Sequence, residues 1–290
     1  MRSRPKYKIV LHDFNPLKHQ SKILVKMDVI LLAITGFFLI IWIYLLGLRG
    51  EFWRSNQRLG KPRHQLVSYP SVCAVIPARN EAELLPLTLK SLLAQDYPGK
   101  FRVILVDDQS SDGTAKVARE VAEQLKRTQQ LEILSSQPLP PGWTGKLWAI
   151  EQGICHVQSQ ANPPDYFLLT DADIEHCQNN LCQLVTKAEQ DNLDLVSLMV
   201  LLRNESFWEK FLIPAFVFFF QKLYPFPWVN DPKNKTAAAA GGCILIRCKA
   251  LERIGGIPVL RQALIDDCTL AQKVKSSQVD EQPTSIWLGL

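Results

Sequence analysis

The sequence lacks the cysteine and histidine patterns that define zinc-bound or disulfide-linked proteins. Its 290 residues hold seven cysteines and five histidines, and no two cysteines form a C-x-x-C pair. Cys177 and Cys182, like Cys243 and Cys248, have no matching histidines at the spacing of a zinc site. An odd count without a disulfide framework is typical of a reducing compartment. We therefore expect the cysteines to be mostly buried, small hydrophobic side chains.

An excess of positive charge is absent from most of the chain, although the net charge is +5. Residues 1–63 hold 12 Lys and Arg against 3 Asp and Glu, whereas residues 64–290 hold 21 against 25. The larger part is therefore slightly acidic, which argues against nucleic acid as a partner. The basic segment is instead typical of a flank beside anionic lipid.

One segment lacks charge altogether. Residues 29–48 are twenty consecutive uncharged residues, and a helix of that length spans about 30 Å, the thickness of a bilayer's hydrocarbon core. No A-x-A-like cleavage site follows, and the run is longer than the apolar region of a signal peptide. We interpret it as an uncleaved membrane anchor rather than a buried core helix. The predicted organisation is a basic tail (1–28), a transmembrane helix (29–48), a basic linker (49–69) and one domain (70–290).

Basic residues flank the anchor on both sides, and more of them follow it than precede it. The following ones are Arg49, Arg54, Arg58, Lys61 and Arg63, and the preceding ones are Lys18, Lys22 and Lys26. The positive-inside rule then predicts a single-pass protein of the inner (plasma) membrane with its domain in the cytoplasm. A start at Met27 would remove the upstream basic residues. N-terminal sequencing of the native protein tests this hypothesis, because Arg2 or Ser3 near the terminus would contradict it.

Strand and helix patterns alternate beyond residue 70. Strands are expected at 71–76, 101–106, 131–134, 166–169 and 193–201, and helices at 81–95, 113–125 and 147–157. This alternation predicts an α/β domain with a mainly parallel sheet and helices on both faces.

Residues 207–228 do not fit that alternation. They contain an apolar run that Pro214 breaks and that is too short to span a bilayer. Two interpretations fit equally well. The segment lies in the membrane interface with Trp208, Tyr224 and Trp228 at headgroup level, or it forms a helix packed under the sheet.

A pair of carboxylates follows the strand pattern that ends near residue 170. Asp171 and Asp173 are two residues apart at the carboxyl end of that strand, where open α/β sheets bind ligands. Two hard oxygen ligands suit Mg²⁺ or Mn²⁺, and such an ion takes its other ligands from water and substrate phosphates. The alternative is a solvated turn or a helix N-cap.

Two polar motifs follow the first two strand patterns. The run P-A-R-N-E at 77–81 offers backbone N–H groups and short side chains to a nucleotide base or ribose, unless Asn80 simply caps a helix. Asp107 and Asp108 can accept hydrogen bonds from the imide N–H of uracil and from ribose hydroxyls. Residues 110–114 then supply a turn and a helix cap.

Three further motifs carry candidate residues, and two of them open helix patterns. Lys146 opens a helix pattern where a positive charge suits a phosphate, although the surrounding residues are not a P-loop. Gly241 and Gly242 let a ligand approach the backbone closely, or they form a packed turn. Asp266 and Asp267 open a helix pattern, where the helix dipole favours carboxylates in any case.

Taken in order, the motifs P-A-R-N-E, V-D-D-Q-S-S-D-G-T, G-K-L-W-A, D-A-D, G-G-C and I-D-D resemble the family 2 glycosyltransferases, which have the GT-A nucleotide-diphospho-sugar transferase fold. The resemblance covers about residues 70–275. The forms P-G-W-T-G-K-L-W-A, T-A-A-A-A-G-G-C and A-L-I-D-D-C look closest to the hopene-associated glycosyltransferase subgroup. Members of that subgroup are bacterial membrane enzymes linked to hopanoid biosynthesis.

This resemblance implies a role for each motif. The residues implied to contact the nucleotide-sugar are Pro77, Ala78, Arg79, Asn80, Glu81, Asp107, Asp108, Lys146, Asp171, Gly241, Gly242 and Asp266. Asp171 and Asp173 match the D-x-D motif that holds the divalent ion, Mg²⁺ or Mn²⁺, and the diphosphate. Asp267 matches the catalytic base of inverting members, and Asp266 stands where the family often has Glu.

The implied function is that of a membrane-anchored, metal-dependent, hexosyltransferase-like inverting enzyme. It would move a sugar from a nucleotide-diphospho-sugar, with a UDP-sugar expected, to a hydroxyl of a membrane lipid. The chain stops at Leu290 without the Q-x-x-R-W-type motif of relatives, so the domain is expected to be truncated at its C-terminus. Two alternatives stay open: an inactive, membrane-anchored nucleotide-binding remnant, and a polysaccharide-type glycosyltransferase.

Overall fold

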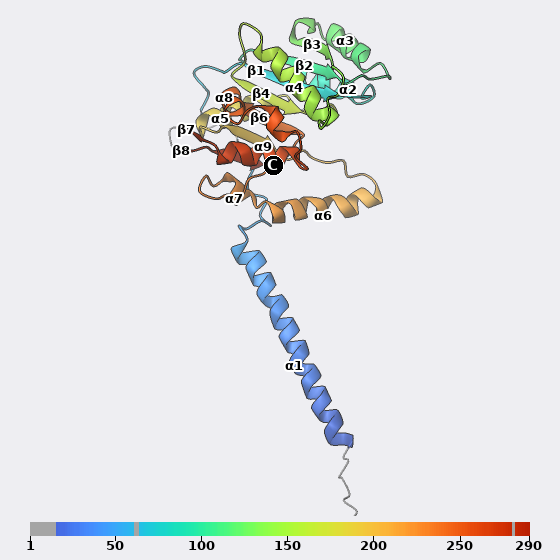
Figure 1. Ribbon diagram of the computed structural model, residues 1–290, viewed down its shortest axis with the longest axis vertical. Helices are drawn as coiled ribbons and strands as arrows, with labels where there is room; N and C mark the ends of the chain where they lie inside the picture. Colours follow the sequence, from blue (N-terminus) through green and yellow to red (C-terminus); the bar gives the residue numbers. More distant parts are fainter. Residues whose placement is uncertain (1–15, 61–63, 280–281) are drawn as a thin grey trace, which may run out of the picture. The chain divides into compact units, whose positions relative to one another are not determined.

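The computed structural model describes residues 16–60, 64–279 and 282–290. The chain divides into two compact units, Met1–Arg49 and Gly50–Leu290. In the first unit, helix α1 (Pro16–Ile43) continues into a π-helical turn, η1 (Tyr44–Leu48). Within the described residues, Lys26–Leu48 is the one helical segment long and apolar enough to cross a membrane (Figure 1). Because α1 begins at Pro16, part of the predicted tail is helical, and residues 1–15 lie outside the described residues.

The second unit is built on a seven-stranded sheet in the order β3-β2-β1-β4-β6-β5-β9. Its strands are β1 (Val72–Ala78), β2 (Phe101–Asp107), β3 (Leu131–Ser135), β4 (Tyr166–Thr170), β5 (Leu195–Leu198), β6 (Cys243–Arg247) and β9 (Ile286–Gly289). β6 runs antiparallel to both of its neighbours, and the other pairs are parallel. The predicted α/β fold with a mainly parallel sheet is confirmed. A small hairpin joins β7 (Gln278–Val279) to β8 (Gln282–Pro283).

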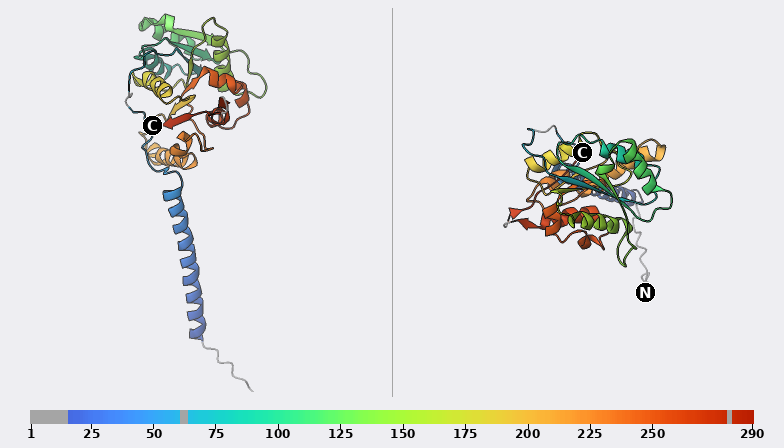
Figure 2. Two further views of the ribbon diagram at one scale, coloured as in Figure 1. Left: turned by 90° about the vertical axis from the view of Figure 1, so that its left-hand side faces the viewer. Right: turned by 90° about the horizontal axis from the view of Figure 1, so that it is seen from above.

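Helices cover both faces of this sheet (Figure 2). The helices of this unit are α2 (Leu85–Leu93), α3 (Thr114–Gln124), α4 (Gly145–Gln158), α5 (Asn180–Gln190), α6 (Phe207–Leu223), α7 (Phe226–Asn230), α8 (Cys248–Arg253) and α9 (Asp266–Ser276), with short 3-10 turns η2 (Thr128–Gln130) and η3 (Ile257–Leu260).

Strand β1 shows how the sheet separates two hydrophobic clusters. Cys73 and Val75 pack with residues of α4, α8 and α9, whereas Val72, Ala74 and Ile76 pack with residues of α2, α3 and α5. The alternation follows from the strand geometry, in which successive side chains point to opposite faces. Complete burial of a large aliphatic side chain contributes about 1.5–3 kcal/mol, so this central strand is a main source of stability.

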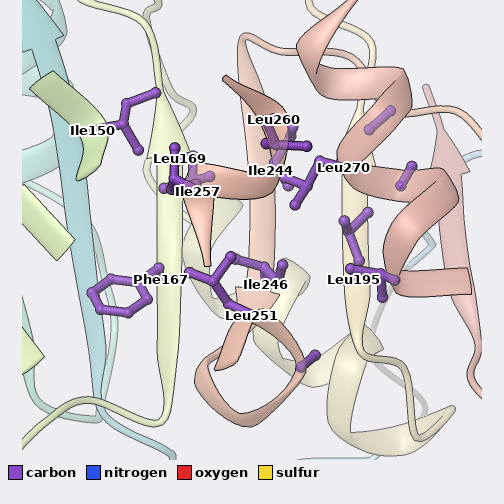
Figure 3. Packing of buried hydrophobic residues seen from close by; sticks show 14 of the residues in the cluster. Ile150, Phe167, Leu169, Leu195, Ile244, Ile246, Leu251, Ile257, Leu260 and Leu270 are labelled. Carbon is purple, nitrogen blue, oxygen red and sulfur yellow. The ribbon is translucent and has the colours of Figure 1, made fainter. Parts of the chain in front are cut away.

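The cluster on the α4 and α9 face supports the edge of the sheet where the polar motifs lie. Figure 3 shows Leu169 of β4 and Ile244 of β6 packed with Ile150 of α4 and Leu270 of α9. Leu169 precedes Asp171 by two residues. The backbone that carries the first carboxylate is therefore anchored in a close-packed core, which limits its freedom to move.

Several boundaries differ from the sequence-based expectation. Helix α2 begins at Leu85 rather than at residue 81, and residues 82–84 form a turn before it. The N–H groups of Glu81 and Ala82 are directed instead to Thr114 and Asp112 at the neighbouring turn into α3. Strand β5 ends at Leu198 instead of residue 201, and Leu201 is fully exposed. Strand β6 was not predicted, since its apolar residues run directly into α8 and show no strand-like alternation.

Helix α6 is not packed under the sheet, so that interpretation of residues 207–228 is wrong. Gln221 is its one buried residue, and its aromatic side chains are largely exposed. The following helix, α7, supplies the buried contacts instead, through Phe226 and Val229.

All seven cysteines lie in the described part of the chain, and none forms a disulfide. Four are buried and one is half-buried, which confirms the prediction that most are small core residues. Cys155 and Cys177 are exposed.

Candidate functional site

Strand order and register bring the separate sequence motifs to one edge of the sheet. The parallel strands β1, β2 and β4 end at the same edge, so the residues that follow them are neighbours. Thr170, the last residue of β4, pairs with Cys243, the first residue of antiparallel β6. Gly241, which precedes β6, therefore lies at the edge that carries Asp171 and Asp173.

An open pocket of about 380 Å³ lies at this edge. Such a volume is within the usual range for sites that bind small molecules. Its lining combines residues that follow β1, β2 and β4 with the first turn of α4. They are Pro77, Ala78, Arg79, Glu81, Asp108, Gly145, Lys146, Ala149, Asp171, Ala172 and Asp173.

Asp108 is buried at the wall of this pocket, and its orientation is fixed by hydrogen bonds. Ser136 donates through Oγ to Oδ1 at 3.2 Å, and Arg79 donates through Nη1 to Oδ2 at 3.3 Å. A Cβ atom at Gly145 would lie 2.8 Å from Oδ2. Any larger residue at this position would displace the carboxylate or the start of α4, because the two approach each other closely here.

Lys146 projects from the first turn of α4 toward Asp171. The helix is capped by Thr144, whose Oγ1 accepts a hydrogen bond from the Leu147 N–H at 3.4 Å. Nζ of Lys146 lies 2.5 Å from Oδ1 of Asp171. Both side chains are partly exposed, so water weakens the ion pair and the amine can exchange this partner for an anionic ligand.

Asp267 lies in the first turn of α9, where backbone groups hold its carboxylate. Gly241 donates its N–H to Oδ2 at 2.9 Å, and Cys268 donates its N–H to Oδ1 at 2.7 Å. Burial raises the pKa of the Asp267 carboxyl, and the charge of Asp266 adds to this, although the backbone hydrogen bonds oppose it. A carboxylate with a raised pKa accepts a proton more readily than an ordinary aspartate.

Gly241 lies close to the side chains of both Lys146 and Asp267. A Cβ atom on Gly241 would be 3.4 Å from Oδ2 of Asp267 and 3.7 Å from Nζ of Lys146. These three residues and Asp266 also line a second pocket of about 30 Å³ with largely apolar walls. Because Lys146 lines both pockets, its amine connects the larger pocket to the Asp267 carboxylate.

The larger pocket concentrates negative charge. Burial raises the pKa of Glu81, and the charges of Asp173, Asp112 and Asp171 raise it further. Carboxylate oxygens at this density suit a hard divalent cation, so Asp171 and Asp173 fit such an ion by their chemistry. Across the described ranges, no group of three or more His, Cys, Asp and Glu residues that could hold a metal is present. An ion on this pair would take its other ligands from phosphate and water.

Three residues of the predicted set do not line either pocket. Oδ1 of Asp107 accepts the N–H of Ser110 at 3.2 Å, and Oδ1 of Asn80 accepts the N–H of Ser111 at 2.8 Å. Gly242 packs against aliphatic side chains. These residues shape the turns at the pocket's edge. Asn80 is not the N-cap of α2, which begins after Leu84.

Sequence reasoning did not single out some residues that shape the site. Gly145 and Ala149 line the larger pocket, and the G-K-L-W-A motif carries both, so that motif was the available signal. Ser136 orients Asp108 from the loop after β3, and a lone serine in a loop gives no signal.

The strand order, the reversed strand β6 and the pocket at the sheet edge are those of a GT-A glycosyltransferase fold. The family model described as glycosyl transferase family 2 matches residues 73–255, and this chain belongs to that family.

Three curated relatives are similar over part of the chain. One is a 4,4'-diaponeurosporenoate glycosyltransferase of Staphylococcus haemolyticus, 32% identical over 36% of this chain and 24% of its own length. Another is a beta-monoglucosyldiacylglycerol synthase of Trichormus variabilis, 27% identical over 52% and 31%. The third is an undecaprenyl-phosphate 4-deoxy-4-formamido-L-arabinose transferase of Photorhabdus laumondii, 33% identical over 48% and 40%. The matched segment spans less than half the length of each relative.

Among solved structures, the mannosyltransferase PcManGT from Pyrobaculum calidifontis, in complex with GDP-Man and Mn²⁺, is similar in fold. It has a TM-score of 0.56 at 21% identity, over 86% of this chain and 66% of its own.

Proposed function

We propose that this protein is an inverting, metal-dependent glycosyltransferase that moves a hexose from a nucleotide-diphospho-sugar to a hydroxyl group of a membrane lipid. One observation carries the proposal. Lys146 lines the larger pocket beside Asp171 and also lines the second pocket together with Gly241 and Asp267. A phosphate-binding cation and a candidate proton acceptor therefore face the same space, as a transfer reaction requires.

The nucleoside part of the donor is assigned to the wall formed by residues 77–81 and Asp108. The carboxylate of Asp108 is oriented by Arg79 and Ser136, and it can accept hydrogen bonds from the imide N–H of uracil or from ribose hydroxyls. We therefore expect a UDP-sugar as donor. The structural neighbour named above holds GDP-Man, so GDP-sugars belong in the same test.

Asp171 and Asp173 are the residues we assign to a divalent cation, Mg²⁺ or Mn²⁺. The support is their hard oxygen donors, the acidic surroundings that raise the pKa of Glu81, and the Mn²⁺ in the structural neighbour. When bound, such an ion would supply positive charge to the diphosphate. The ion pair with Lys146 neutralises part of the charge on Asp171.

The proposed chemistry is a single displacement. The carboxylate of Asp267 removes the proton from the acceptor hydroxyl as that oxygen forms a bond to the anomeric carbon of the sugar. The bond from the anomeric carbon to the diphosphate oxygen breaks, and the nucleoside diphosphate leaves with its electron pair. Lys146 stabilises the negative charge that develops there. One base acting opposite the leaving group inverts the anomeric configuration.

The lipid acceptor is supported by a pocket that includes Cys268, the residue after Asp267. A third pocket of about 370 Å³ is lined by Tyr224, Ala237, Leu264, Ile265, Cys268, Thr269 and Gln272. Its walls are largely apolar, and Cys268 is the residue next to the proposed base. The names of the relatives point the same way, because they specify diacylglycerol, undecaprenyl-phosphate and diaponeurosporenoate.

We propose a hopanoid lipid as the first acceptor to examine, on the basis of the hopene-associated sequence motifs alone. We also propose that the protein is held in the plasma membrane by the segment Lys26–Leu48 with its domain in the cytoplasm.

The test is a transfer assay with the full chain in nanodiscs. Labelled UDP- and GDP-sugars, Mg²⁺ or Mn²⁺, and a bacterial lipid extract containing hopanoids would be supplied together. Formation of a labelled, solvent-extractable lipid establishes the enzyme, and mass spectrometry identifies the acceptor. Donor binding without product under every condition would contradict the proposal and favour an inactive nucleotide-binding protein.

A further inference from the structure

Helix α6 turns its apolar side chains outward from the domain. Its exposed large hydrophobic residues include Phe207, Trp208, Phe211, Leu212, Phe216, Phe218 and Phe219. An ordinary surface helix directs its apolar stripe toward the core and its polar face outward. A contiguous apolar surface of this kind marks a site of interaction with another protein or with a membrane.

The spacing of these residues makes the surface continuous along the helix. Trp208, Leu212, Phe216 and Phe219 follow one another at intervals of three or four residues, so they occupy one face over successive turns. Figure 1 shows α6 outside the α/β layers, along one side of the domain. At 1.5 Å per residue, its 17 residues are about 25 Å long.

The charges of α6 complement an anionic surface. Its single acidic residue, Glu209, is engaged in a capping box, where Oε2 accepts the N–H of Ser206 at 2.7 Å and Oγ of Ser206 accepts the N–H of Glu209 at 3.3 Å. Lys210 and Lys222 are its basic residues. A helix with an aromatic face and lysines beside it is typical of segments that lie on anionic membranes.

The segment that leaves the candidate membrane span is packed against α6 and α7. Phe52 is buried, and its ring lies edge-on to Phe218 with centroids 5.2 Å apart. A Cβ atom on Gly50 would come within 2.7 Å of the Trp228 indole. Gly50 and Phe52 are the second and fourth residues after Leu48, where the span ends. Since two residues extend at most about 7 Å and four at most about 14 Å, the chain connects α7 and then α6 to the end of the candidate span over these short lengths.

We propose that α6 lies in the plane of the membrane, with its Trp208–Phe219 face inserted among the lipid headgroups and upper acyl chains. The short segment that joins α6 and α7 to the candidate span, and the two lysines of α6, favour a lipid bilayer as the partner of this face. The consequence for the site is direct. Tyr224, the C-terminal cap of α6, and Cys268, the neighbour of Asp267, line the same apolar pocket. The membrane surface would thus be continuous with the pocket beside the proposed base.

The experiment measures the depth of Trp208 by lipid quenching. The full chain is placed in nanodiscs of phosphatidylcholine with a minor share of phosphatidylglycerol, and the lipids are brominated near the headgroup or near the bilayer centre. The difference in fluorescence emission between the original chain and Trp208→Phe gives the contribution of Trp208. Trp148→Phe is the matched control, because Trp148 lies on α4 with its indole N–H bonded to the Gln137 carbonyl.

We expect lipids brominated near the headgroup to quench Trp208 emission at least about twofold and more strongly than lipids brominated near the centre, with Trp148 unaffected. A second probe, Phe216→Trp in the Trp208→Phe chain, should behave like Trp208. Quenching of Trp208 by aqueous acrylamide but not by brominated lipid would overturn the proposal. Protection from both quenchers in a chain that is dimeric by mass photometry would assign this face to a second copy and would overturn it as well.

Discussion

The backbone N–H of Gly241 donates a hydrogen bond to Oδ2 of Asp267 at 2.9 Å, which links the residues before β6 to the start of α9. This contact holds the proposed base against the edge of the sheet, and a Cβ atom on Gly241 would lie 3.4 Å from Oδ2 of Asp267 and 3.7 Å from Nζ of Lys146. The absence of a side chain at Gly241 keeps the space between amine and carboxylate open.

Gly241→Ala should therefore damage transfer more than folding. The added Cβ would make ordinary contacts of 3.4 Å and 3.7 Å, so the chain should fold with little change in melting temperature. The methyl group would nevertheless occupy the space between Lys146 and Asp267, and we expect kcat to fall about 100-fold. Comparison of thermal unfolding with the initial rate of transfer checks this. Equal losses of stability and activity would point to a structural role instead.

The pH profile of transfer should reveal the raised pKa of Asp267. The base acts in its deprotonated form, so kcat/KM should fall as the pH drops through this pKa, which burial raises above the ordinary value of about 3.9. The acidic limb should therefore begin at a higher pH than an exposed aspartate would give. Donor binding measured by calorimetry over the same range separates this effect from titration of Glu81. An acidic limb at or below pH 4 would contradict the assignment.

Gly145→Ala should weaken donor binding through Asp108. The new Cβ would lie 2.8 Å from Oδ2 of Asp108, so the carboxylate or the start of α4 must shift. We expect the Kd for UDP to rise about tenfold, in line with the usual cost of overpacking a filled site. Gly60→Ala is the matched control, because a Cβ there would meet nothing within 4 Å. A similar Kd for both variants would remove Asp108 from the proposed nucleoside wall.

Asp173→Ala should abolish the metal-dependent part of donor binding. The pocket would then retain one carboxylate of the proposed cation-binding pair, Asp171, which is already paired with Lys146. We expect Mn²⁺ to strengthen UDP binding by the original chain at least about tenfold and to have no effect on the variant. If Mn²⁺ changed UDP binding neither in the original chain nor in the variant, the assignment of a cation to this site would be contradicted.

Periodicity predicts the fold well where an element is both apolar and regular. The strands at β1, β2 and β4 are short apolar runs followed by polar turns, so their position and their shared edge are readable from sequence. Strand β6 is not readable, because Cys243–Arg247 passes without a break into α8. Its pairing with β4 is a long-range contact, and that contact brings Gly241 to the site. Local patterns carry no information on which strand is reversed.

The candidate site was partly predictable for the same reason. Asp171, Asp173, Lys146 and Asp267 are polar residues at the starts and ends of regular elements, and each converges on the pockets. Within a motif, the sequence does not show which of two adjacent residues lines the pocket, because neighbouring side chains point in different directions. Asp108 lines the larger pocket, whereas Asp107 bonds to its own turn. The sequence did not decide whether residues 207–228 pack under the sheet or face outward, because an apolar run does not show which of its side chains are buried.

The most direct measurement for the proposed function compares sugar transfer and donor binding in Asp267→Asn. An asparagine can keep the hydrogen bond from the Gly241 N–H but loses the one from the Cys268 N–H, so thermal unfolding is measured beside transfer to confirm that the fold is intact. Glu123→Gln on the exposed side of α3 serves as control. We predict that transfer falls by roughly 10²–10⁴ while the Kd for the nucleotide-sugar stays the same, since only the proton acceptor is lost. Full transfer activity in Asp267→Asn would contradict the account.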